Sequence, residues 1–139
     1  MILIHELSHV YSPGTVFEKK ALDHVDLKIE DGEILGIIGH TGSGKSTLIQ
    51  HLNGLLKPTE GAVYFNGEDI HDKDFSMKKL RSKIGLVFQY PEHQLFESTV
   101  IEDVQFGPKN MGLDPLEMEM RSFEALKQVG MGEEYLDVS

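Results

Sequence analysis

The residues best suited to chemistry lie in one glycine-rich stretch, residues 39–46, which reads GHTGSGKS. This spacing satisfies the pattern G-x-x-x-x-G-K-[ST], in which successive backbone N–H groups surround phosphate oxygens. A short apolar run, Ile34–Ile38, precedes the stretch, and Leu48, Ile49 and Leu52 recur at helical spacing after it. The sequence therefore predicts a phosphate-binding loop between a buried strand and a helix, with a nucleoside triphosphate as its ligand.

Each residue type in this loop has a physical reason. The glycines allow close approaches that a side chain would obstruct. Lys45 reaches the β- and γ-phosphates as a mobile charge, the Ser46 hydroxyl is a ligand for Mg²⁺, and Lys45 is the first predicted catalytic residue. We expect Thr47 to donate its N–H and its hydroxyl to the α-phosphate. The predicted nucleotide-contacting residues of the loop are Gly39, His40, Thr41, Gly42, Ser43, Gly44, Lys45, Ser46 and Thr47.

The surrounding elements follow from periodicity and from helix-start signals. Val25–Glu30 alternates as a half-exposed strand does, Ala62–Phe65 and Ile84–Phe88 are predicted as further strands, and Ile34–Ile38 is predicted as a strand buried on both faces. Beyond Ser98, capping-box spacings predict two helices with an apolar stripe on the second. The residues are Thr99 with Glu102, Asp114 with Glu117, Pro115, and the stripe Leu116, Met120, Phe123 and Leu126. We therefore expect a nucleotide-binding region, residues 1–97, and a helical region, residues 98–139.

Composition excludes several classes of protein. The 139 residues carry 13 basic and 23 acidic side chains, a formal charge of −10, and include no cysteine. The lack of cysteine excludes disulfides and thiol chemistry. The acidic net charge argues against a nucleic-acid partner held by a broad basic face. The seven histidines are scattered without paired metal-ligand spacing. Neither an apolar run long enough to cross a bilayer nor a signal peptide is visible, so we expect a cytoplasmic protein.

Three further stretches resemble ABC-type ATPases. Leu55–Gly61 is similar to the segment that follows the phosphate-loop helix in that family, and Val87-Phe88-Gln89 resembles its Q-loop. Tyr11 lies where the family carries the aromatic residue that stacks on adenine, with Phe17 as the alternative. The resemblance implies that Gln89 senses the γ-phosphate and the metal, as a second catalytic residue and a second Mg²⁺ ligand, and that ATP is the nucleotide.

A closer resemblance is to the energy-coupling factor ATPases, which drive uptake of vitamins and metal ions. It rests on the motifs Gln89–Phe96, Phe106-Gly107-Pro108 and Gln50–Leu56, and it points to the second of two ATPase paralogues. It implies an α/β fold of the P-loop NTPase (ABC ATPase) type, with an antiparallel β-subdomain, an incomplete core sheet and the start of a helical subdomain. The implied partners are a second ATPase subunit, a membrane-embedded coupling subunit and a substrate-binding membrane subunit, at the cytoplasmic face of the membrane as a peripheral protein.

Members of that family continue to a signature motif, a Walker B strand and a switch histidine, none of which is present in these residues. We therefore expect the sequence to be the N-terminal half of a longer ATPase. Alone, the 139-residue piece should be inactive in hydrolysis and unstable or prone to associate, because a buried parallel strand without partners leaves backbone groups unpaired. Two alternatives remain open: a soluble, non-transport ABC-type ATPase that acts on ribosomes or DNA, and a non-catalytic nucleotide-binding fragment.

Overall fold

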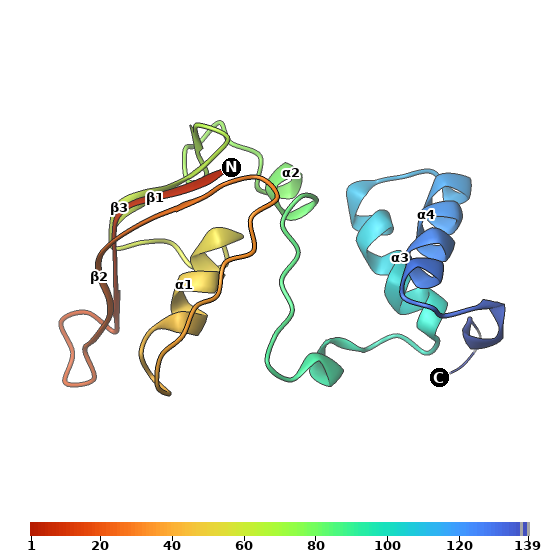
Figure 1. Cartoon of the computed structure of the whole chain (residues 1–139), viewed down its shortest axis with the longest axis horizontal. Helices are drawn as coiled ribbons and strands as arrows, with labels where there is room; N and C mark the ends of the chain where they lie inside the picture. Colours follow the sequence, from red (N-terminus) through yellow and green to blue (C-terminus); the bar gives the residue numbers. More distant parts are fainter. Residues whose placement is uncertain (137, 139) are drawn as a thin grey trace. The chain divides into compact units, whose positions relative to one another are not determined.

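A computed structural model of the chain describes residues 1–136 and 138 (Figure 1). Contacts divide the chain into two compact units, Met1–Leu86 and Val87–Ser139, which are treated separately below. This division, between residues 86 and 87, lies before the boundary between residues 97 and 98 that the sequence predicts. The predicted boundary separates functional regions and stays a prediction. The predicted helical region, 98–139, ends with two positions, 137 and 139, outside the described residues.

A four-stranded antiparallel sheet organises the first unit, in the order β2-β1-β3-β4. Its strands are β1 (Ile2–Tyr11), β2 (Lys19–Ile29), β3 (Glu60–Phe65) and β4 (Glu68–Asp69). The predicted strand over residues 62–65 is thus confirmed within β3, and the one over residues 25–30 is confirmed within β2 up to Ile29. Both segments alternate or carry β-branched and aromatic residues, which suit a sheet with one face against a core.

The core of this unit lies between the sheet and two helices, α1 (Lys45–Leu52) and α2 (Met77–Arg81) (Figure 1). One cluster of buried apolar side chains joins the strands to both helices: Ile4, Leu7, Leu22, Leu48, Val63, Ile70 and Leu80. Arg81 of α2 donates to the carbonyl oxygens of Asn53 (3.4 Å) and Gly54 (3.1 Å), which follow α1. The predicted helix after the loop is therefore confirmed and is held at its C-terminal end by α2.

The two expected strands Ile34–Ile38 and Ile84–Phe88 are wrong for this structure, because neither segment forms a strand. Ile34 and Ile38 are 99% and 95% exposed, although they were expected to be buried on both faces. A strand needs hydrogen-bonding partners on a neighbouring strand, and among the described residues neither segment pairs with one. Ile37 and Ile84 keep partial contact with the core cluster.

The second unit is built on two neighbouring helices, α3 (Val100–Met111) and α4 (Pro115–Gln128), with the single-turn helices η1 (Pro91–Gln94) and η2 (Glu133–Tyr135) on either side in sequence. The capping box at Thr99 is confirmed, because Thr99 and Glu102 bond reciprocally. Asp114 caps α4 through the N–H groups of Leu116 and Glu117.

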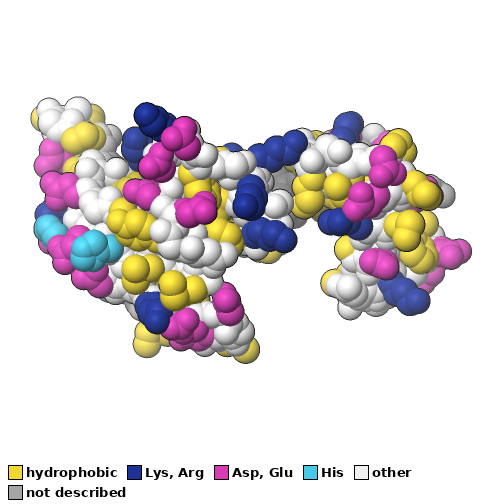
Figure 2. All heavy atoms as spheres, turned by 90° about the horizontal axis from the view of Figure 1, so that it is seen from above, with side chains coloured by type: hydrophobic (Ala, Val, Ile, Leu, Met, Phe, Trp, Pro, Cys, Tyr) yellow, Lys and Arg dark blue, Asp and Glu magenta, His cyan; other side chains and the backbone are white. Residues whose placement is uncertain are grey.

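Few side chains of the second unit are buried. Among its described residues only Ser122 and Leu126 are, and Leu116 and Met120 of the predicted stripe are exposed. Figure 2 shows hydrophobic side chains among charged ones on the visible faces of both units. The helices of this unit are therefore defined mainly by their caps and by contact with each other.

Candidate nucleotide-binding site

The glycine-rich loop runs from Gly39 to Gly44 and leads directly into α1. Gly44 is the N-cap of α1 with a φ of 93°, and a Cβ atom there would lie 2.6 Å from the carbonyl oxygen of Ala21 in β2. A Cβ at Gly39 would lie 2.5 Å from Ser43 Oγ. At Gly44 the positive φ and the β2 backbone leave no room for a side chain, so this position requires glycine, whereas a Cβ at Gly39 would require only that the Ser43 hydroxyl move.

The Lys45 side chain turns back over this cradle. Its Nζ donates to the carbonyl oxygens of Gly39 (2.6 Å) and His40 (2.8 Å), and Ser43 Oγ lies 3.4 Å away. No side chain from the described residues caps the N-terminus of α1, so the first N–H groups of the helix are free to bind an anion. An ammonium group, a helix N-terminus and a glycine cradle meet at one place, which fits the phosphates of a nucleotide.

Ser46 and Thr47 occupy the first turn of α1 in different environments. Ser46 is exposed, as a hydroxyl that would hold Mg²⁺ needs to be. Thr47 is buried, and its Oγ1 lies 3.1 Å from the phenolic oxygen of Tyr11. The hydroxyl expected to bond a phosphate is therefore already engaged by Tyr11. The other loop positions, His40, Thr41, Gly42 and Ser43, are exposed.

Tyr11 ends β1 beside the first turn of α1. Its hydrogen bond to Thr47 joins the two segments, and Tyr11 as a whole residue remains 38% exposed. The structure thus brings Tyr11 next to Thr47 in the first turn of α1, and the role of Tyr11 toward a nucleotide stays a prediction. Phe17, the alternative, lies in the turn between β1 and β2 and is largely exposed, so the geometry favours Tyr11.

Behind these residues lie two buried histidines that sequence reasoning gave no role. His51 of α1 is fully buried, its Nδ1 donates to the Thr47 carbonyl oxygen (2.7 Å), and its Nε2 lies 3.2 Å from His9 Nδ1. Burial lowers the pKa of His51 below its usual 6.5. The available signal was spacing, since His51 lies one helical turn after Thr47 and His9 two strand positions before Tyr11. Among the described residues, no group of three or more His, Asp or Glu side chains could hold a metal ion.

Gln89 belongs to the second unit, where it is exposed in the stretch before η1. Its role toward Lys45 and the metal therefore stays a prediction. Further along, Asp103 of α3 accepts hydrogen bonds from the N–H groups of Phe96 and Glu97, both 3.2 Å. The Phe96 ring meets Phe106 edge to face at 4.8 Å. These contacts tie the segment after η1 to α3.

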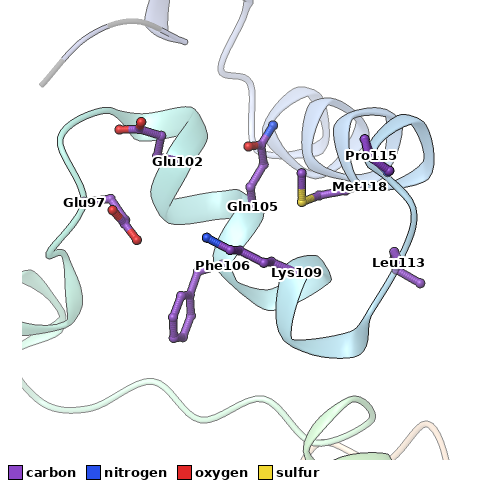
Figure 3. A pocket seen from close by; sticks show the side chains of 8 residues that line it. All are labelled: Glu97, Glu102, Gln105, Phe106, Lys109, Leu113, Pro115 and Met118. Atoms are coloured by element: carbon purple, nitrogen blue, oxygen red, sulfur yellow. The ribbon is translucent and has the colours of Figure 1, made fainter.

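Two pockets are formed by described residues of the second unit. One, of about 350 Å³, has a mixed lining; Figure 3 shows Glu97 and Glu102 on one side, Leu113 and Pro115 on the other, and Lys109 between them. The other, of about 530 Å³, is mainly apolar and includes Leu95, Val104, Leu126 and Met131. Within the part of the chain that the structure describes, no helix is both long and apolar enough to cross a membrane.

Comparison with known proteins agrees with the geometry of the loop. Residues 22–138 match the family described as ABC transporter. The chain is 57% identical over 136 residues to the energy-coupling factor transporter ATP-binding protein EcfA2 of Clostridium acetobutylicum, covering 98% of the chain and 47% of the relative. It is 58% identical over 130 residues to EcfA2 of Symbiobacterium thermophilum, covering 94% and 45%. The chain thus spans about half the length of the curated relatives it matches.

Solved structures are similar as well. A dimeric ATP-binding cassette in a post-hydrolysis state, bound to ADP and Pi, matches with a TM-score of 0.84 at 31% identity, over 100% of this chain and 61% of that one. The cbiO1 protein of Clostridium perfringens, part of the ABC transporter complex cbiONQ, matches with a TM-score of 0.77 at 42% identity, over 98% and 52%.

Proposed function

The chain belongs to the ABC transporter family, and on that premise we propose that the whole protein is the ATP-binding subunit of an energy-coupling factor transporter. Membership of the family confirms the resemblance seen in the sequence, and the similar solved structures confirm the P-loop ABC ATPase fold. Proteins of this family bind ATP and hydrolyse it. The proposal for the whole protein is that ATP binding and hydrolysis drive uptake of a vitamin or a metal ion across a membrane.

One observation carries the nucleotide assignment: Lys45 Nζ folds back onto the carbonyl oxygens of Gly39 and His40, in a glycine-rich loop that leads into the N-terminus of α1, which no described side chain caps. Lys45 binds the β- and γ-phosphates there, and the N–H groups at the start of α1 bind phosphate oxygens. Ser46 would hold Mg²⁺, which when bound neutralises charge between the β- and γ-phosphates. The Tyr11 ring stacks on the adenine, and Gln89 senses the γ-phosphate and the metal.

The second unit supplies the proposed contact with the membrane subunits. Its apolar pocket and its exposed Leu116 and Met120 offer surface that helices of a coupling subunit would cover. The proposed complex also contains a second ATPase subunit and a substrate-binding membrane subunit, and in this proposal the protein lies at the cytoplasmic face of the membrane. Copurification of the full-length protein with a membrane subunit tests this placement, and isolation with ribosomes or DNA instead would favour the soluble alternative.

The nucleotide assignment is tested by Lys45→Ala in the full-length protein. We expect its affinity for Mg-ATP to fall at least about a hundredfold, measured by titration calorimetry, because the main positive charge of the cradle is removed. Lys73→Ala, an exposed lysine outside the cradle, is the matched control and should bind as the wild type does. Wild-type affinity in Lys45→Ala would overturn the site.

Gln89→Ala separates binding from coupling. We expect it to bind Mg-ATP within about threefold of the wild type while transport-coupled hydrolysis falls at least about tenfold, because Gln89 acts on the γ-phosphate end only. Equal losses in binding and in coupled hydrolysis would contradict the sensing role.

A further inference from the structure

Two histidines from distant parts of the sequence meet under the nucleotide site. His9 comes from β1 and His51 from α1, and their rings are 4.7 Å apart, close to edge to face. Both side chains are buried, His51 completely. Histidine is seldom fully buried without a partner, so this pair needs a physical account.

The histidine pair contacts both α1 and Tyr11, the two parts of the proposed nucleotide site described above. On one side, His51 Nδ1 donates to the Thr47 carbonyl oxygen at 2.7 Å, which holds the first turn of α1. On the other side, the His9 ring meets the Tyr11 ring edge to face at 4.6 Å. The hydrogen bond between Tyr11 and Thr47 joins these two ends. Four residues therefore form a closed circuit, which we call the histidine circuit: Tyr11, His9, His51 and Thr47.

The positions of the protons follow from the acceptors. A carbonyl oxygen can only accept, so the bond to Thr47 requires a hydrogen on His51 Nδ1. His9 Nδ1 lies 3.2 Å from the Lys57 carbonyl oxygen and must carry a hydrogen for the same reason. That hydrogen also faces His51 Nε2 at 3.2 Å, which then accepts it as an unprotonated nitrogen. When the hydrogen of His9 Nδ1 is shared between the Lys57 carbonyl oxygen and His51 Nε2, a neutral His51 satisfies every contact of the circuit.

From this arrangement we propose that His9 and His51 are positioning residues, which hold the Tyr11 ring against the first turn of α1 before nucleotide binds. The inference rests on the proposed function, because it requires the base on Tyr11 and the phosphates on the loop. A free tyrosine ring at the end of a strand would sample several rotamers, and ordering it on binding would weaken affinity. The circuit orders the ring in advance, so it raises affinity without touching the nucleotide.

The test is a double-mutant cycle on Mg-ADP affinity in the full-length protein, measured by titration calorimetry. The variants are His51→Leu, Tyr11→Leu and both together. We expect His51→Leu to weaken binding about fivefold when Tyr11 is present and less than about twofold in the Tyr11→Leu background, because no ring is left to position. An equal loss in both backgrounds would overturn the inference.

A matched control separates positioning from simple loss of stability. Leu48→Ala removes a buried side chain from the same helix, outside the circuit. Its effect on Mg-ADP affinity should be the same in both Tyr11 backgrounds. If His51→Leu fails to fold, His9→Leu replaces it in the same cycle, and an equal loss in both backgrounds would again overturn the inference.

The same measurements distinguish failure of this inference from failure of the proposed function. If the wild type fails to bind Mg-ADP, or if Tyr11→Leu binds it as tightly as the wild type, the nucleotide assignment or the base-stacking role is wrong. Suppose that the wild type binds Mg-ADP and Tyr11→Leu weakens that binding. If the losses from His51→Leu and Tyr11→Leu then simply add, the positioning role is refuted while the nucleotide assignment stands.

Discussion

The first unit buries seven apolar side chains in one cluster, whereas in the described part of the second unit Leu126 is the single buried apolar side chain. The first unit joins strands and helices that are far apart in sequence. The second is a helical hairpin whose hydrogen-bonded caps, at Thr99 and Asp114, are local.

This difference explains how well each predicted site residue is positioned. Tyr11 and Thr47 are attached to elements that the core cluster holds, and they contact each other directly. Gln89 is exposed in a stretch that is neither helix nor strand, so the interior of its own unit does not determine its place. The comparison teaches that the predicted phosphate-binding residues lie on elements with a shared core, whereas the predicted Q-loop residue Gln89 lies in an exposed segment without regular secondary structure.

The strongest test of this contrast compares two buried leucines. We expect Leu7→Ala to lower the free energy of unfolding of the full-length protein by about 3–4 kcal/mol, since it leaves a cavity in a packed cluster. Leu126→Ala should cost only about 1–2 kcal/mol, because its sparse surroundings can collapse. Urea denaturation measures both. Equal losses would mean that the second unit has a core as tight as the first.

A smaller effect is expected at the cap of α3. Thr99→Ala removes the capping-box bond from the Glu102 N–H to Thr99 Oγ1 and the additional bond from Thr99 Oγ1 to the Glu102 carboxylate, and it should destabilise the start of α3 by about 1 kcal/mol. Hydrogen exchange of the amides of residues 100–103 measures this locally. Ser98→Ala, one position earlier and outside the capping box, is the matched control. Unchanged exchange in Thr99→Ala would show that the helix is held by packing instead.

The smallest effect is a pH dependence confined to the first unit. Burial lowers the pKa of His51 and of His71 below 6.5. The unfolded chain therefore binds more protons than the folded one near that pH, and stability rises with pH. The contribution is complete above about pH 7 and is lost as pH falls below about 6.5 toward the lower folded pKa values.

Urea midpoints of the full-length protein at pH 8 and pH 5.5 test this dependence. The wild type should unfold at lower urea at pH 5.5, and His51→Leu should show a smaller difference between the two pH values. The groups that face His51 from neighbouring segments, His9, Lys57 and His71, remain in that variant. The same difference in both proteins would contradict a role for His51.

Local features of this protein could be predicted from the sequence. The phosphate loop, the capping box at Thr99 and the Asp114 cap depend on residues within a few positions of one another, and all are present. The strands that contain Val25–Ile29 and Ala62–Phe65 were also predictable, because their patterns reflect one buried face. The structure of two other segments, Ile34–Ile38 and Ile84–Phe88, was not predictable from the sequence. An apolar run indicates a tendency to form a strand, but it does not indicate whether a partner strand is available.

The sequence by itself predicted a phosphate-binding loop of glycines and a lysine and determined that a helix begins there, since both depend on consecutive residues. Only the tertiary structure decided that Tyr11 contacts Thr47 and that His9 and His51 meet beneath them. These side-chain contacts require the first turns of α1 to lie close to the end of β1. That packing comes from burial of the shared core, whose members are distant in sequence, and no local pattern encodes it.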